Sequence, residues 1–87
     1  MIRVKITTGS MKHGDFWNME LDYDSFDDLK EDLTDKGVTH IEGNRIIGSK
    51  TDTTEITVHA RIPATIRSSA VVSAELCTFN FIEGEAA

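Results

Sequence analysis

The sequence of 87 residues has little cysteine, little proline and no long apolar run. Its one cysteine, Cys77, excludes an intramolecular disulfide and a zinc site built from cysteines, which needs several of them. No apolar stretch approaches the roughly 20 residues of a transmembrane helix, and the first residues lack the apolar run of a signal peptide. We therefore expect a cytoplasmic protein that does not contact the membrane and that forms one domain over residues 1–87.

Interior space is also scarce. A chain of this length buries only about two thirds of the surface that its unfolded form exposes, so one core uses most of its apolar residues. Little volume is left for a cofactor, and we expect none.

Basic clusters are missing as well. The formal net charge is −6, from nine Lys and Arg against fifteen Asp and Glu. Residues 15–36 hold nine acidic and two basic residues, so the rest of the chain is nearly neutral. Because proteins neutralise phosphates with Lys and Arg, we expect no direct binding of DNA or RNA. The acidic stretch suits a basic protein partner, or it is a solvated face that keeps a small protein in solution.

The first two predicted elements are strands. Apolar and polar residues alternate over residues 2–8 and again over residues 15–22, which is the period of a strand with one face on a core. A short loop rich in glycine separates the two strands, so we expect an antiparallel hairpin. Its inner face would carry Ile2, Val4, Ile6, Trp17, Met19 and Leu21.

A helix is predicted over residues 25–36. Its apolar residues follow the spacing i, i+3 and i+7, and acidic residues in the first turn complement the positive end of the helix dipole. Asp24 or Ser25 is the expected N-cap, Lys36 suits the negative end, and Gly37 is the expected left-handed stop. The apolar stripe is narrow, so this helix should lie across one face of a sheet with its carboxylates in water.

The second half of the chain reads mainly as strands. We expect a strand over residues 38–42, a turn over residues 42–45 into a short hairpin at residues 46–47, and a polar loop over residues 48–53. A strand over residues 54–62 should end at Pro63. Residues 68–76 fit a serine-capped helix or a strand, and the β-branched pair Val71 and Val72 favours one strand over residues 70–82, followed by a frayed tail over residues 83–87.

These elements together predict an α+β fold. It comprises an antiparallel sheet of four to five strands in β-β-α-β-β order, with the helix packed on one face.

Residue patterns that support catalysis or metal binding are lacking. The three histidines, His13, His40 and His59, show no helical ligand spacing, and Cys77 falls in an apolar strand where an inert thiol is common. The glycines are scattered without a phosphate-binding pattern. We therefore expect no enzyme, no catalytic residue and no metal site.

The residues expected to contact a partner are the carboxylates of the acidic stretch and the aromatic residues beside them. Phe16 falls on the face opposite Trp17, where either the helix covers it or it is exposed to a partner. The expected contact residues are Phe16, Glu20, Asp22, Tyr23, Asp24, Asp27, Asp28, Glu31, Asp32 and Asp35.

The order of a two-stranded opening, an acidic capped helix written DSFDDLKEDLTDKG and then VTHIEG with further strands resembles small proteins of phages and mobile elements, including some anti-CRISPR inhibitors. The resemblance covers architecture, size and acidity, and it assigns no residue. It implies a protein that occupies a basic, nucleic-acid-binding surface of a larger host protein. The alternative is a small structural component that forms a homodimer through an edge strand near Phe79, Phe81 and Ile82.

Overall fold

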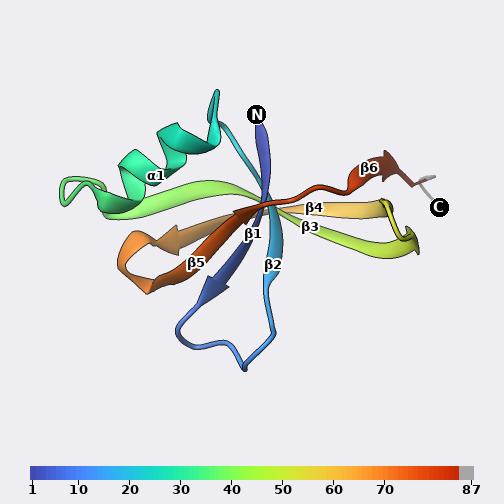
Figure 1. The fold of residues 1–87 in the computed structure, drawn as a ribbon, viewed down its shortest axis with the longest axis horizontal. Coiled ribbons are helices and arrows are strands. Elements are labelled where there is room, and N and C mark those ends of the chain that lie inside the picture. The colour runs from blue at the N-terminus through green and yellow to red at the C-terminus, as the bar shows by residue number, and fades with distance from the viewer. Residues whose placement is uncertain (85–87) are drawn as a thin grey trace.

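Residues 1–84 are described by a computed structural model, in which one helix accompanies a six-stranded sheet (Figure 1). The elements are β1 (Ile2–Thr8), β2 (Trp17–Leu21), α1 (Phe26–Thr34), β3 (His40–Asp52), β4 (Glu55–Arg67), the short 3-10 helix η1 (Ser68–Ala70), β5 (Val71–Leu76) and β6 (Asn80–Glu83). The strand order across the sheet is β5-β1-β2-β3-β4-β6. The prediction of a mixed fold with one helix is confirmed, whereas the sheet has more strands than expected.

The first hairpin forms as predicted. β1 and β2 pair antiparallel, with Val4 opposite Met19 and Ile2 opposite Leu21. Val4, Met19 and Leu21 are fully buried on the face that packs against α1. Gly14 in the connecting loop has a φ of 89°, a left-handed conformation that glycine adopts without strain.

Helix α1 is shorter than predicted at both ends. Ser25 is the N-cap, and its hydroxyl accepts a hydrogen bond from the backbone N–H of Asp28 at 3.3 Å. At the other end Asp35 is the C-cap, and its carboxylate accepts the N–H of Gly37 at 2.8 Å. Gly37 does not take the left-handed conformation that we predicted, because the helix ends two residues earlier, at Asp35, whose backbone is extended.

β3 and β4 form one long hairpin, which contradicts several of the predicted turns. We expected a turn over residues 42–45, a short hairpin at residues 46–47 and a loop over residues 48–53, yet β3 runs without a break from His40 to Asp52. Most of these residues are polar and at least partly exposed. A run of polar residues with glycines is also typical of a loop, which is why the sequence did not predict one continuous strand. The turn lies at Thr53 and Thr54.

Gly43 lies at the closest approach between β2 and β3. A Cβ atom there would collide with the carbonyl oxygen of Glu20 and would come within 2.5 Å of Leu21 Cδ2. Glycine is therefore required in this strand for packing, although the pair Gly43-Asn44 is typical of turns.

Pro63 does not end β4 as predicted. It lies opposite Asn44 in the hairpin, and the strand continues to Arg67. β6 pairs with β4 only from Glu55 to Val58, so β4 is an edge strand at Pro63, where a missing N–H is tolerated.

The predicted strand over residues 70–82 is in fact two strands. Val71–Leu76 forms β5 beside β1, while Asn80–Glu83 forms β6 parallel to β4 at the opposite edge of the sheet. The predicted frayed tail is wrong at its start, because Glu83 belongs to β6 and the N–H of Gly84 bonds the carbonyl of Val58 at 2.8 Å. Residues 85–87 lie outside the described residues.

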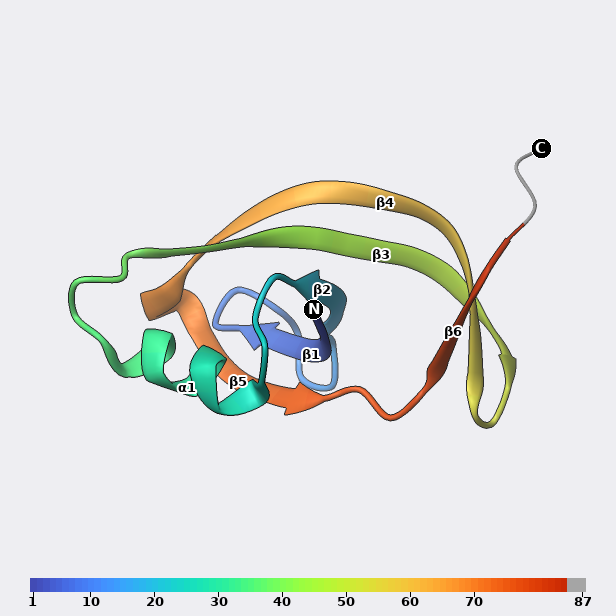
Figure 2. The same cartoon turned by 90° about the horizontal axis from the view of Figure 1, so that it is seen from above.

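The strongly curved sheet buries apolar residues on both faces. Figure 2 shows the β3–β4 hairpin arched over β1 and β2, with the chain after β5 running on beneath the arch to β6 near the turn of the hairpin. The main core packs against α1 and is formed by Val4, Ile6, Met19, Leu21, Leu29, Ile41 and Ile66. Ile46, Ile56 and Val58 are buried outside that core, on the face of the sheet that points away from α1.

Candidate functional site

The carboxylates of α1 and of its approach define the acidic face of the protein. Asp24 precedes the N-cap, and Asp27 and Glu31 lie one turn apart on the exposed side of the helix. Leu29 is fully buried on the opposite side and so fixes which side of α1 meets solvent. The acidic face, as we use the term, comprises Asp22, Asp24, Asp27, Asp28, Glu31, Asp32 and Asp35.

Little positive charge offsets the acidic face. Among residues 1–84 its single ion pair joins Lys30 Nζ to Asp27 Oδ1 at 3.6 Å, and both side chains are largely exposed. Exposed pairs of this kind are weak, since water and salt screen them. The face therefore presents a row of carboxylates along about two turns of helix.

Tyr23 supports the acidic face rather than extending it. Its hydroxyl donates a 2.6 Å hydrogen bond to Asp32 Oδ2, which ties the segment before α1 to the helix. Burial, followed by this hydrogen bond and the negative charge of Asp32, raises the pKa of Tyr23 to about 12. Tyr23 is half-buried, so its polar end is already satisfied within the protein.

Glu20 is not part of the acidic face. We expected Glu20 to contact a partner together with the other carboxylates of the acidic stretch, but its side chain is 4% exposed and lies on the face of the sheet away from α1. Arg3 reaches it at 3.4 Å from β1, and Arg61 bonds it from β4. The expectation is wrong at this residue because a buried carboxylate is stable when cations pair with it.

The cluster around Glu20 extends to the last strand. Arg61 also bonds Glu83 on β6, with 2.8 Å between Arg61 Nη1 and Glu83 Oε2. The hydrogen bond to Glu83, and then the one to Glu20, raise the pKa of the Arg61 guanidinium, and the same bond from Arg61 holds the pKa of Glu83 below its usual range. The Arg3 guanidinium lies 5.0 Å from the centre of the Phe81 ring. These charged groups therefore link side chains of β1, β2, β4 and β6 on one face of the sheet.

We expected Phe16 either to be covered by the helix or to be exposed. It is exposed, but it does not lie beside the acidic face. It is 45% exposed just before β2. The Lys5 ammonium lies 4.9 Å from its ring centre, and Lys5 alternates with the buried Val4 and Ile6, so it points away from α1. Phe16 and α1 therefore lie on opposite faces of the sheet.

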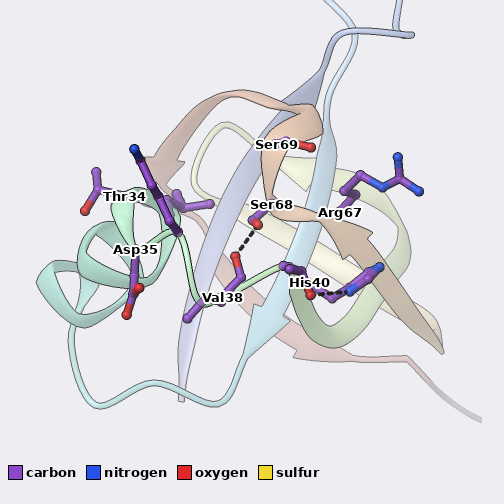
Figure 3. Close-up of a pocket in the computed structure, with 10 residues that line it drawn as sticks. Thr34, Asp35, Val38, His40, Arg67, Ser68 and Ser69 are labelled. Carbon is purple, nitrogen blue, oxygen red and sulfur yellow. Dashed lines mark hydrogen bonds between the residues drawn. The ribbon is translucent and has the colours of Figure 1, made fainter.

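An open depression lies where the end of α1 meets the start of β3 and the end of β4. It has a volume of about 540 Å³, and Figure 3 shows the residues that line it. Ser68 Oγ donates to the carbonyl of Val38 at 2.6 Å, and Thr39 Oγ1 lies 2.9 Å from His40 Nδ1. In Figure 3 the side chains of His40 and Arg67 lie on one side of the depression and Asp35 on the other, so they do not converge on a common point.

Metal ligands do not gather in the described part of the chain. No group of three His, Cys, Asp or Glu residues within residues 1–84 is placed to hold a metal ion. His40 lies opposite Arg67 in the hairpin register, while His59 bonds Ser49 Oγ at 2.8 Å. Over the same residues, α1 is too short and too polar to cross a membrane.

Sequence reasoning missed the clusters on the face of the sheet away from α1. Alternation along β1 and β2 assigns Arg3, Lys5 and Glu20 to one face, and that signal was available. Nothing in the sequence indicates that Arg61 or Phe79 would join them, because the register of β4 and the crossing of the C-terminal segment bring them there.

The chain matches no protein-family model, no curated protein and no solved structure.

Proposed function

We propose that this chain is a non-enzymatic protein-binding module that docks its acidic face on a basic surface of a larger protein. A groove that normally binds nucleic acid is the surface that such a face fits best. The observation that carries the proposal is the row of carboxylates along the exposed side of α1, with Lys30 as the nearby counter-charge.

The spacing of these carboxylates supports the proposal. Residues three and four positions apart on a helix have Cβ atoms about 5–6 Å apart, which is comparable to the spacing of phosphates along a nucleic-acid strand. Asp27, Asp28 and Glu31, all within α1, follow this spacing. A helix that presents such a row resembles one strand of phosphates to a basic groove.

The packing beneath the helix also supports it. Leu29 is fully buried, Ser25 caps the first turn, and the bond from Tyr23 to Asp32 fixes the helix to the preceding segment. A preorganised row of charges loses little conformational entropy when it binds. Charge complementarity would speed association and make binding sensitive to salt.

We also propose that the protein is an inhibitor like the small proteins of phages and mobile elements that its sequence resembles, which include anti-CRISPR inhibitors. The aromatic anchor expected at Phe16 is not included, because Phe16 lies on the other face of the sheet. Tyr23 at the edge of the acidic face is the nearer aromatic residue.

The experiment compares two variants of equal net charge. The first neutralises the acidic face by Asp24→Asn, Asp27→Asn, Asp28→Asn and Glu31→Gln, which leaves the bonds of Asp32 and Asp35 intact. The matched control neutralises four carboxylates elsewhere, by Asp15→Asn, Glu42→Gln, Glu55→Gln and Glu75→Gln. A partner is captured with the wild-type chain from a lysate of the source cells, and its affinity is measured across a salt series.

The two variants should differ. We expect the first to weaken binding at least about tenfold and to flatten its salt dependence, while the control stays close to wild type. Equal affinity and equal salt slope in all three proteins would show that the acidic face is a solvated surface and would refute the proposal.

A second candidate function is self-assembly through a sheet edge. β5 and β6 are the two edges of the sheet, and Val72 and Leu76 on β5 are 69% and 52% exposed. Exposed apolar edge strands pair readily with other strands. Light scattering across a concentration series tests this candidate, and a monomer at every concentration would exclude it. A dimer that Val72→Lys converts to a monomer would support it.

A further inference from the structure

A pocket on the face of the sheet away from α1 combines two cations with two aromatic rings. It is open, has a volume of about 300 Å³ and lies between the strands β1 to β4 and the chain that joins β5 to β6. Its lining residues include Lys5, Phe16, Asn18, Lys50, Ile56 and Phe79, and we call it the cation–aromatic pocket.

The two lysines approach the same ring. Lys5 Nζ lies 5.3 Å and Lys50 Nζ 5.6 Å from the centre of Phe79, so the two ammonium groups are no farther apart than the sum of these distances. Among residues 1–84 neither forms an ion pair with a carboxylate, although Glu75 lies opposite Lys5 across the β1–β5 pair. Two like charges at one pocket repel each other, and an anion bound between them relieves that repulsion.

The aromatic side of the pocket is open to a ligand. Phe16 is 45% exposed, although exposing a large apolar ring to water is unfavourable. Ile56 is 8% exposed and forms part of the apolar wall. A flat ring placed against this wall would cover apolar surface, and the side-chain amide of Asn18 would offer donors and an acceptor to its polar edge.

From these contacts we infer that the cation–aromatic pocket binds a phosphate monoester whose organic group contains an aromatic ring. A phosphate monoester carries a charge of about −1.5 to −2 at neutral pH, which matches the two lysines. The volume of about 300 Å³ is at the low end for ligand sites, which suits one ring with its phosphate. A long polyanion fits poorly, because the whole chain carries a net charge of −6.

Two sources share this chemistry, a nucleoside monophosphate and a phosphotyrosine side chain. The test titrates the isotope-labelled full chain with adenosine monophosphate and, separately, with O-phosphotyrosine, and follows the NMR resonances of Lys5, Phe16, Lys50 and Phe79. Adenosine, tyrosine and inorganic phosphate serve as controls that lack either the phosphate or the ring. We expect either adenosine monophosphate or O-phosphotyrosine to bind at these residues, and every control to bind at least about tenfold more weakly.

Variants then test the lysine and the ring separately. Lys50→Gln at an exposed position should weaken binding of that ligand at least about tenfold, and Phe16→Ala should weaken it as well. Lys12→Gln removes an exposed lysine outside the pocket and should leave the affinity unchanged.

Three results would overturn the inference. The first is that neither adenosine monophosphate nor O-phosphotyrosine binds at millimolar concentration. The second is that inorganic phosphate binds as tightly as these two ligands. The third is that Lys12→Gln loses as much affinity as Lys50→Gln. The acidic face lies on the other side of the sheet, so either proposal can fail without the other.

Discussion

Arg61 on β4 and Glu83 on β6 are joined by two hydrogen bonds between the guanidinium and the carboxylate. The same guanidinium bonds the buried Glu20 from its Nε atom. Glu83 is 67% exposed at its side chain, whereas Glu20 is 4% exposed, so Arg61 links a carboxylate in water to one inside the protein. The Arg61–Glu20 pair should therefore contribute more to the free energy of unfolding than the Arg61–Glu83 pair.

Arg61→Ala should lower the free energy of unfolding more than Glu83→Gln does. The first change leaves the buried Glu20 carboxylate with Arg3 alone at 3.4 Å, and an under-compensated buried charge is costly. The second change removes an exposed pair, which contributes little. Urea unfolding at neutral pH measures both. Arg67→Ala, on the same strand and in no ion pair among residues 1–84, is the control and should stay near wild type. Equal midpoints for Arg61→Ala and Arg67→Ala would contradict the role given to Arg61.

The bond between Arg61 and Glu83 should depend on pH in one direction. Because the pKa of Glu83 is lowered from its ordinary value of 4.5 in the folded protein, its stabilising contribution is present above that value and disappears as the pH falls through the lowered pKa. The difference in urea midpoint between wild type and Glu83→Gln should therefore shrink as the pH falls below about 4.5. A difference that stays constant down to pH values well below this range would show that the pair does not titrate as described.

Tyr23 provides a direct titration. It is the one tyrosine of the chain, so phenolate absorbance at high pH reports it alone, and we expect a midpoint of about 12. Because the folded pKa is above the ordinary value of 10.0, the resulting stabilisation is present below pH 10.0 and is lost as the pH rises through about 12. Asp32→Asn should lower the midpoint only part of the way toward 10.0, because burial is the larger cause. A midpoint of 10.0 in the wild type would contradict the hydrogen bond.

Gly43→Ala tests the close approach of β2 and β3. The added Cβ would meet the Glu20 backbone and the Leu21 side chain, so the strands must separate, at a cost of about 1–3 kcal/mol in the free energy of unfolding. Gly9→Ala is the matched control, since a Cβ there would meet only Val72 Cγ2 at the ordinary distance of 3.9 Å. Thermal or urea unfolding of the two variants gives the comparison, and equal stability would refute the steric account.

The parts of the fold that could be predicted are those set by local pattern. Alternation in β1 and β2 gave the correct hairpin and the correct inner face, and capping and spacing gave α1. The continuous strand β3 was not predicted, because Gly43 and Asn44 are turn residues in sequence statistics. Gly43 is present for a contact with β2, and a contact between distant residues leaves no local signal.

The acidic face could be predicted from the sequence, since it lies on one helix whose orientation Leu29 determines. Burial of Glu20 could not, because it depends on Arg61, which comes from β4 through a register that includes a bulge near Gly48. The cation–aromatic pocket depends on Phe79 crossing the sheet between β5 and β6. That crossing follows from the pairing of the two last strands with opposite edges of the sheet.

The pairing of β1 with β5 also governs how the chain reaches this structure. Val4 lies opposite Leu76, so a central strand and an edge strand from nearly opposite ends of the described chain must meet to complete the sheet. Topologies dominated by such distant contacts fold slowly, over about milliseconds to seconds. The β3–β4 hairpin needs only its own short turn, so its strands pair without waiting for the two ends of the chain to meet. Until β5 docks, the backbone edge of β1 that faces it is unpaired, and an open strand edge makes a folding intermediate prone to aggregate.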